Sequence, residues 1–142
     1  MRRNRRFPAA KRSVPAARQF VAAALNGAPE DIRDSVMLMV SELAMNAVQH
    51  ARTEFTVGVE LTCGTLQVEV ADMGAGVPEA CPAPPVSDLH GRGLFIVARL
   101  SDAWGVDPAR GGPGKKVWFR VSLAPGPGAL AQSATPLVQP AN

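Results

Sequence analysis

One long amphipathic helix, expected from Pro29 to about His50, constrains the fold of this chain more than any other segment. Its apolar side chains recur three and four positions apart, as they do on one face of a helix: Ile32, Val36, Val40, Leu43 and Ala47. Residues four apart stack on the same face, so Glu42, Asn46 and His50 are expected to align beside this stripe. At about 100° per residue, Asn46 lies roughly 80° and Glu42 roughly 120° from the centre of the stripe. We therefore expect a carboxylate and a carboxamide at the rim of a buried helix face, where both can act on a ligand.

Two glycine-rich segments downstream predict a site for phosphate or a nucleotide. Asp72-Met73-Gly74-Ala75-Gly76 follows a segment that alternates like a half-buried strand, and His90-Gly91-Arg92-Gly93-Leu94 precedes a helical pattern. Glycine lets the backbone approach a ligand closely, and the unpaired N–H groups at a helix start suit phosphate oxygens. An aspartate at a strand end can accept a hydrogen bond from a base amino group. A dinucleotide-binding fold is excluded, because Ile96 replaces the third glycine of Gly-x-Gly-x-x-Gly and no second βαβ unit follows.

The remaining patterns predict an α+β two-layer sandwich. Helices are expected over 16–25, 29–50 and 91–101, and strands over 54–62, 65–71, 103–107 and 116–123. The first two strands flank a tight Cys63-Gly64 turn, which is typical of a hairpin. Helices that alternate with a hairpin and a terminal strand pair favour a sheet with helices packed on it.

Charge and composition divide the chain into three parts. We expect a basic disordered arm over 1–12, one folded domain over 13–123 and a disordered Pro/Gly-rich tail over 124–142. Seven of the 15 basic residues lie within the first 18 positions, which contain no acid, and the other eight face 12 acidic residues. Such an arm suits an acidic protein partner. No nucleic-acid partner is expected, because the domain lacks a basic stripe and the arm lacks interleaved aromatic residues.

Compartment and metal content are indicated by what the sequence lacks. It has no apolar run long enough to span a membrane and no export signal, so a cytoplasmic protein with no membrane partner is expected. Two cysteines and two histidines do not form the closely spaced pairs of a zinc site: Cys63, Cys81, His50 and His90. Both cysteines are expected as free thiols.

The order of these motifs resembles the Bergerat-fold (GHKL) ATP-binding superfamily, above all its small single-domain branch, the bacterial anti-sigma-factor serine kinases. The similarity includes Ser-Glu-Leu…Asn-Ala…His-Ala from Ser41, Gly-Arg-Gly-Leu from Gly91, and a closing Trp-Gly-Val…Gly-Lys-x-Val-Trp-Phe from Trp104. It covers about Ser13 to Leu123. The resemblance implies a mixed, mostly antiparallel sheet covered on one face by about three helices.

The resemblance also implies ATP and Mg²⁺ as cofactors and gives roles to matching positions. Glu42 is implied as the general base and Asn46 as the Mg²⁺ ligand, since a carboxamide oxygen is a hard donor. Asp72 would accept from the adenine amino group, whereas His50 is interpreted as structural. The implied nucleotide-binding residues are Asn46, Asp72, Gly74, Gly76, Gly91, Arg92, Gly93 and Leu94. Where many relatives have a threonine in the last strand, this chain has Lys116, so the resemblance does not extend to the adenine contact at that position.

By resemblance, the chain is an ATP-dependent serine protein kinase that regulates transcription by partner switching. It would bind a sigma factor or another regulator and phosphorylate a small anti-anti-sigma protein. The alternative is a non-catalytic module that uses nucleotide only to set its partner-binding shape. A sensor histidine kinase is less consistent, because the chain has no room for a phosphoacceptor helix pair. A homodimer is left open.

Overall fold

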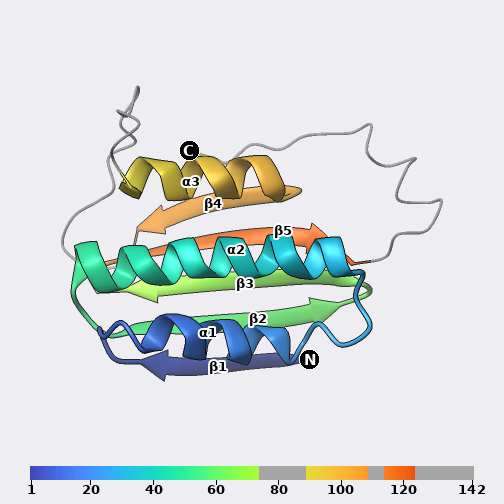
Figure 1. The fold of residues 1–142 in the computed structure, drawn as a ribbon, viewed down its shortest axis with the longest axis horizontal. Coiled ribbons are helices and arrows are strands. Elements are labelled where there is room, and N and C mark those ends of the chain that lie inside the picture. The colour runs from blue at the N-terminus through green and yellow to red at the C-terminus, as the bar shows by residue number, and fades with distance from the viewer. Residues whose placement is uncertain (74–88, 109–113, 124–142) are drawn as a thin grey trace.

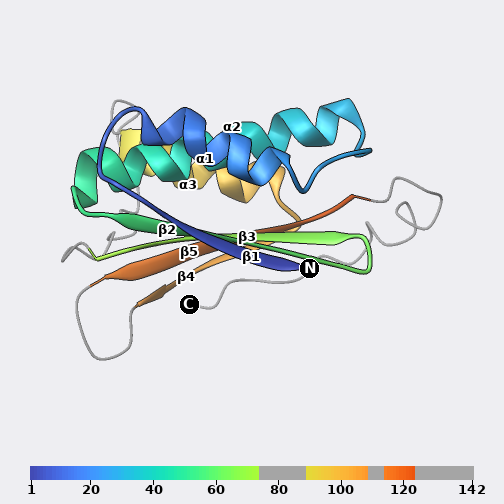
Figure 2. The same cartoon turned by 90° about the horizontal axis from the view of Figure 1, so that it is seen from below.

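The computed structural model describes residues 1–73, 89–108 and 114–123, which form two layers. Within these residues three α-helices lie on one face of a five-stranded sheet, and no helix covers the other face (Figure 1, Figure 2). The strand order is β1-β2-β3-β5-β4, and all neighbouring pairs are antiparallel. The elements are β1 (Arg2–Phe7), α1 (Ser13–Ala22), α2 (Glu30–Asn46), the π-helix η1 (Ala47–Ala51), β2 (Phe55–Thr62), β3 (Thr65–Asp72), α3 (Leu89–Leu100), β4 (Ala103–Pro108) and β5 (Lys115–Ser122). The expected fold class is confirmed.

The two central strands alternate between a buried face and an open face, as a period of two requires. On β3 and β5 the buried residues are Leu66, Val68, Val70, Asp72, Lys115, Val117, Phe119 and Val121. Most of these side chains are apolar and form the floor of the core beneath the helices. Asp72 and Lys115 are the exceptions, and they lie opposite each other in the register at one end of this floor. The sheet therefore carries one buried charged pair at the end of an apolar row.

Helix α2 lies between α1 and α3 and supplies the middle of the helical layer (Figure 1). Its buried face comprises Val36, Met39, Val40, Leu43, Ala44 and Asn46. The predicted apolar stripe is confirmed, although Ile32 at its start is only partly buried. Full burial of a side chain such as Leu43 stabilises the fold by about 1.5–3 kcal/mol. The same packing fixes the orientation of the polar residues at the C-terminal end of α2.

The predicted helix over 29–50 continues to Ala51, but its last turn is a π-helix. The Arg52 N–H donates to the Ala47 carbonyl at 2.9 Å, and Arg52 then adopts a left-handed φ of 58°. The wider turn breaks the four-residue spacing, so His50 is exposed while Asn46 is buried. His50 thus lies in a π-turn that the four-residue spacing of the prediction did not include. π-turns inside helices are frequent at functional sites.

The N-terminal arm is not disordered as the sequence suggested, because Arg2–Phe7 forms the edge strand β1. Its backbone pairs with β2, and the Phe7 ring stacks on Phe55 at a centroid distance of 5.5 Å. The Arg3 guanidinium lies 5.2 Å from the Phe20 ring centroid. Long arginine stems can cover apolar surface while their charge stays in water, so a basic sequence can form a strand. The predicted tail over 124–142 lies outside the described residues.

Candidate functional site

The C-terminal half of α2 and the start of α3 bring three of the predicted site residues together. A Cβ atom placed on Gly93 would lie 3.0 Å from Asn46 Nδ2 and 3.5 Å from Glu42 Cβ. It would also lie 3.6 Å from Glu42 Oε1. Because α3 begins at Leu89, Gly93 lies inside the helix rather than before it. The glycine thus lets α3 approach the polar rim of α2 closely.

Asn46 is a buried polar side chain at this contact. It is 8% exposed, and its carboxamide makes no hydrogen bond within the part of the chain that the structure describes. A buried polar group without a partner costs free energy unless a ligand, ion or water completes it. Glu42, one turn earlier, is half-buried. A carboxylate and an unsatisfied carboxamide therefore face the same contact with α3.

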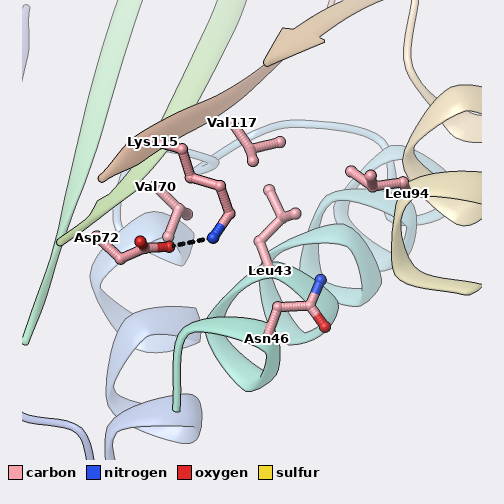
Figure 3. Close-up of a pocket in the computed structure, with 7 residues that line it drawn as sticks. All are labelled: Leu43, Asn46, Val70, Asp72, Leu94, Lys115 and Val117. Carbon is pink, nitrogen blue, oxygen red and sulfur yellow. Dashed lines mark hydrogen bonds and ion pairs between the residues drawn. The ribbon is translucent and has the colours of Figure 1, made fainter. Parts of the chain in front are cut away.

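A small pocket opens beside Asn46, between the helices and the end of the sheet (Figure 3). Its lining residues are Leu43, Asn46, Val70, Asp72, Leu94, Lys115 and Val117. Four of these side chains are apolar and three are polar, a combination typical of small-molecule and cofactor sites. The predicted residues Asn46, Asp72 and Leu94 thus line one pocket.

A buried ion pair occupies the sheet side of this pocket. Lys115 Nζ lies 2.9 Å from Asp72 Oδ2, and the two side chains are 8% and 5% exposed. Figure 3 shows Lys115 reaching from β5 toward Asp72 on the neighbouring strand. Two desolvated charges of opposite sign strengthen each other's hydrogen bonds in such surroundings. Asp72 is therefore engaged by a cation at the position predicted to read a base.

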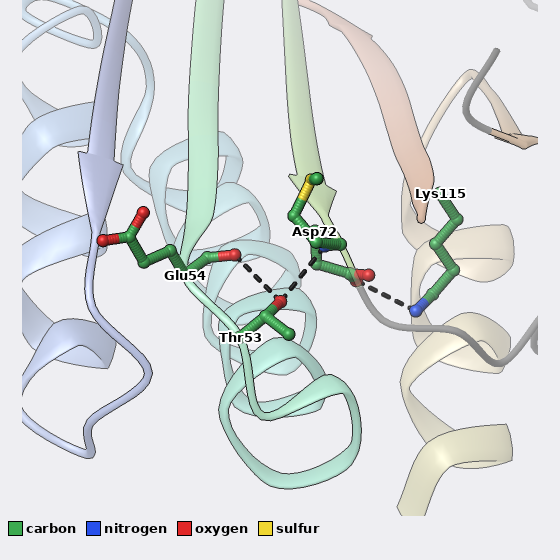
Figure 4. A network of polar contacts seen from close by, with 5 residues as sticks. Thr53, Glu54, Asp72 and Lys115 are labelled. Atoms are coloured by element: carbon green, nitrogen blue, oxygen red, sulfur yellow. Dashed lines mark hydrogen bonds and ion pairs between the residues drawn. The ribbon is translucent and has the colours of Figure 1, made fainter. Parts of the chain in front are cut away.

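Thr53 fixes the end of β3 next to Asp72 (Figure 4). The Met73 N–H donates to Thr53 Oγ1 at 3.1 Å, and the Thr53 hydroxyl donates to the Glu54 carbonyl at 3.0 Å. These bonds tie the segment before β2 to the residue that follows Asp72. The sequence analysis did not identify Thr53, whose signal is only its place next to a strand.

The sequence analysis named Lys116 as the lysine of β5 at the adenine end of the site, but the structure places Lys115 in the pocket. Lys116 lies on the open face of the sheet, where its Nζ is 3.5 Å from Glu69 Oε1 and its side chain is 42% exposed. Lys115 lies on the buried face with Val117, as the alternation of the strand requires. Strand periodicity could therefore have placed Lys115 on the buried face, whereas its pairing with Asp72 depends on the register between β3 and β5.

The other predicted positions are only partly described. Gly74 and Gly76, like Cys81, lie outside the described residues. Gly91 and Arg92 belong to α3, and the structure describes only the backbone of these two residues. Cys63 is an exposed free thiol. Across residues 1–73, 89–108 and 114–123, no helix is long and apolar enough to span a membrane, and no three His, Cys, Asp or Glu residues cluster as metal ligands would.

This fold and pocket define a nucleotide-binding domain of the GHKL type. Residues 7–121 match the histidine kinase-like ATPase domain family, and the chain belongs to that family. The expected superfamily is thereby confirmed, and membership of a family of ATPase domains implies that the chain binds ATP.

Individual relatives agree with this assignment. Blue-light-activated histidine kinase 2 of Erythrobacter litoralis is 33% identical over 104 residues, which cover 68% of this chain and 29% of the relative. The solved RsbU and RsbW domains of Rv1364c from Mycobacterium tuberculosis have a similar fold, with a TM-score of 0.66 and 18% identity. That match covers 87% of this chain and 32% of the other. The Acinetobacter baumannii histidine kinase AdeS matches 85% of this chain and 68% of its own, with a TM-score of 0.50 and 12% identity. This chain thus spans about a third of the first two relatives.

The residues present fit ATP with a divalent cation. The Asn46 carboxamide, which has no hydrogen bond among the described residues, offers a hard oxygen of the kind that Mg²⁺ accepts, and Gly93 lets α3 approach it closely. The apolar walls of the pocket suit the faces of an adenine ring, and Asp72 offers acceptors at its edge. Lys115 is the feature that the family resemblance did not anticipate.

Proposed function

We propose that this chain is an ATP-dependent serine protein kinase that acts by partner switching. It would bind a sigma factor or a comparable regulator and phosphorylate a serine of a small anti-anti-sigma protein. The observation that carries this proposal is the meeting of Glu42 and Asn46 at Gly93, beside a pocket that ends in Asp72. Fold similarity to a chain that contains an RsbW domain supports the choice of pathway.

Each residue has a role that its surroundings support. Asn46 would bind Mg²⁺, Asp72 would accept from the base amino group, and the backbone near Gly91 and Gly93 would lie along the phosphates. Bound Mg-ATP supplies the phosphoryl group, with the metal offsetting its negative charge. Glu42 would accept the proton of the attacking serine hydroxyl, for which its half-buried position leaves it accessible.

The test compares phosphate transfer by the wild-type chain and by Glu42→Gln. The amide keeps the size of the side chain but cannot take the proton, so transfer to a serine-bearing anti-anti-sigma protein should fall by about 10²–10⁴-fold. ATP affinity should stay within about twofold, because Glu42 is not assigned to nucleotide binding. Glu54, an exposed residue before β2, provides a matched control, and Glu54→Gln should transfer at the wild-type rate. Equal transfer by Glu42→Gln and the wild type would contradict the proposal.

A second candidate is a nucleotide-dependent binding module without kinase activity. The Lys115–Asp72 pair favours it, because a base must share Asp72 with an internal cation and the bound geometry can differ from that of active kinases. One measurement, phosphate transfer by the wild-type chain to its captured partner, distinguishes the kinase from the binding module. A wild-type chain that captures its partner with ATP but transfers no phosphate is the binding module.

Partner, location and domain limits are part of the same proposal. We place the kinase domain at about 13–123, and the preceding segment adds the edge strand β1 (Arg2–Phe7) to its sheet. We place the protein in the cytoplasm and keep a homodimer among the states to be measured. Sedimentation of the purified chain with and without Mg-ATP would decide between monomer and dimer.

A further inference from the structure

Lys115 has no role in the proposed phosphate transfer, yet it lines the pocket beside Asp72. Lys115 is 7% exposed, and its ammonium lies 2.9 Å from a carboxylate oxygen. Both side chains line the pocket together with Leu43, Val70 and Val117. Burying a lysine is costly unless it is paired, so a charged pair at the end of an apolar pocket requires an explanation.

The pair presents a donor and an acceptor side by side. A lysine ammonium has three N–H donors and no acceptor, whereas an ionised aspartate only accepts. The Watson–Crick edge of adenine carries the opposite pattern, with the amino group as donor next to ring atom N1 as acceptor. Proteins that read a single base use this edge for hydrogen bonds and pack its faces on apolar side chains.

We propose that Lys115 is a base-reading residue, which donates to N1 of adenine while Asp72 accepts from the adjacent amino group. The inference rests on the proposed nucleotide site. Lys115 uses one of its three donors for Asp72, and a carboxylate has about four acceptor positions, so their ion pair can persist when the base binds. The base then adds bonds to the pair and does not have to break it.

The position of Lys115 in the sheet places its side chain in the pocket. It is opposite Asp72 in the register and on the same face as Val117, which lines the pocket with it. Lys116, the next residue, is on the other face of the sheet and contacts Glu69. The chain thus contains a matched control, a lysine of the same strand that cannot reach the pocket.

The test is a double-mutant cycle that combines a change in the protein with a change in the nucleotide. The two nucleotides are ATP and 1-deaza-ATP, and in 1-deaza-ATP a C–H group replaces N1 and removes that acceptor. Calorimetry measures both affinities for the wild type, Lys115→Met and Lys116→Met. The wild type should prefer ATP by about 10-fold or more, as expected for a buried hydrogen bond from a charged group. The preference should fall below about twofold in Lys115→Met and persist in Lys116→Met.

The comparison remains decisive if Lys115→Met is poorly folded. Partial unfolding lowers both apparent affinities by the same factor, so the ratio within one variant is unaffected. The double variant Lys115→Met/Asp72→Leu removes the unpaired charge as well and leaves no side-chain donor for N1 at either position, so it should also bind both nucleotides equally.

Two results overturn the inference and leave the proposed function intact. One is a wild type that binds ATP and 1-deaza-ATP equally well. The other is tighter binding of ATP by Lys115→Met than by the wild type. That result would mean that Lys115 competes with the base for Asp72. If the wild type binds neither nucleotide, the proposed function fails together with the inference.

Discussion

Replacing Lys115 with Met should destabilise the fold far more than the same change at Lys116. The Lys115–Asp72 pair is 2.9 Å long with side chains 8% and 5% exposed, whereas the Lys116–Glu69 pair is 3.5 Å long and 42% and 21% exposed. Removing one partner of a buried pair leaves an uncompensated charge, which costs about 3–5 kcal/mol. Breaking an exposed pair costs about 0–1 kcal/mol. The two adjacent lysines should therefore differ by roughly 2–5 kcal/mol in the free energy of unfolding.

Urea unfolding followed by circular dichroism measures this difference, provided that the slope of free energy against urea is unchanged. Lys115→Met/Asp72→Asn should recover much of the loss, because the cost comes from the unpaired carboxylate more than from the missing bond. Equal stability of Lys115→Met and Lys116→Met would refute the reasoning. So would a double variant that is less stable than Lys115→Met.

Three further predictions concern other parts of the molecule. Gly93→Ala places a Cβ 3.0 Å from Asn46 Nδ2, so it should weaken Mg-ATP binding severalfold as measured by calorimetry. The thermal midpoint of unfolding should change little, because alanine favours a helix. Unchanged ATP affinity would argue against a tight contact between Gly93 and Asn46. Phe7→Ala should lower the free energy of unfolding by about 3–5 kcal/mol in urea, because Phe7 is 4% exposed and stacks on Phe55. A loss below about 1 kcal/mol would show that β1 contributes little to the stability of the fold. Deleting residues 124–142 should leave ATP affinity unchanged, because every residue assigned to the site precedes this segment; loss of binding by a folded 1–123 chain would contradict this.

The elements that the sequence predicts well are those with a clear period and a marked turn. The stripe of α2 repeats every three to four residues, and the hairpin of β2 and β3 alternates around a Cys63-Gly64 turn with φ of 49° and 79°. Both signals come from local physics, since a period of 3.6 or 2 gives an element one apolar face.

The elements that the sequence analysis missed depend on contacts between distant segments. β1 carries four arginines among its six residues, and only its pairing with β2 and the stacking of Phe7 reveal a strand. The π-turn after Asn46 keeps the helix but rotates His50 into solvent. Such features are set by tertiary packing and not by local propensity.

The candidate site divides in the same way. Glu42, Asn46 and Asp72 could be selected because they belong to short motifs whose residue types suit metal, proton or base contacts. Lys115 could not be selected from motifs, since its meeting with Asp72 depends on the register between β3 and β5. Periodicity would have indicated its face, but only the paired sheet identifies its partner.

The central claim is that the chain binds ATP with Mg²⁺ held by Asn46. Calorimetric titration of ATP tests it most directly, with the wild type and Asn46→Ala each measured in the presence and in the absence of Mg²⁺. The account predicts saturable binding at one site per chain in the wild type. It also predicts that Asn46→Ala lowers affinity by a larger factor with Mg²⁺ than without it, because the carboxamide is assigned to the metal. No binding to the wild type, or an equal loss under both conditions, would contradict the account.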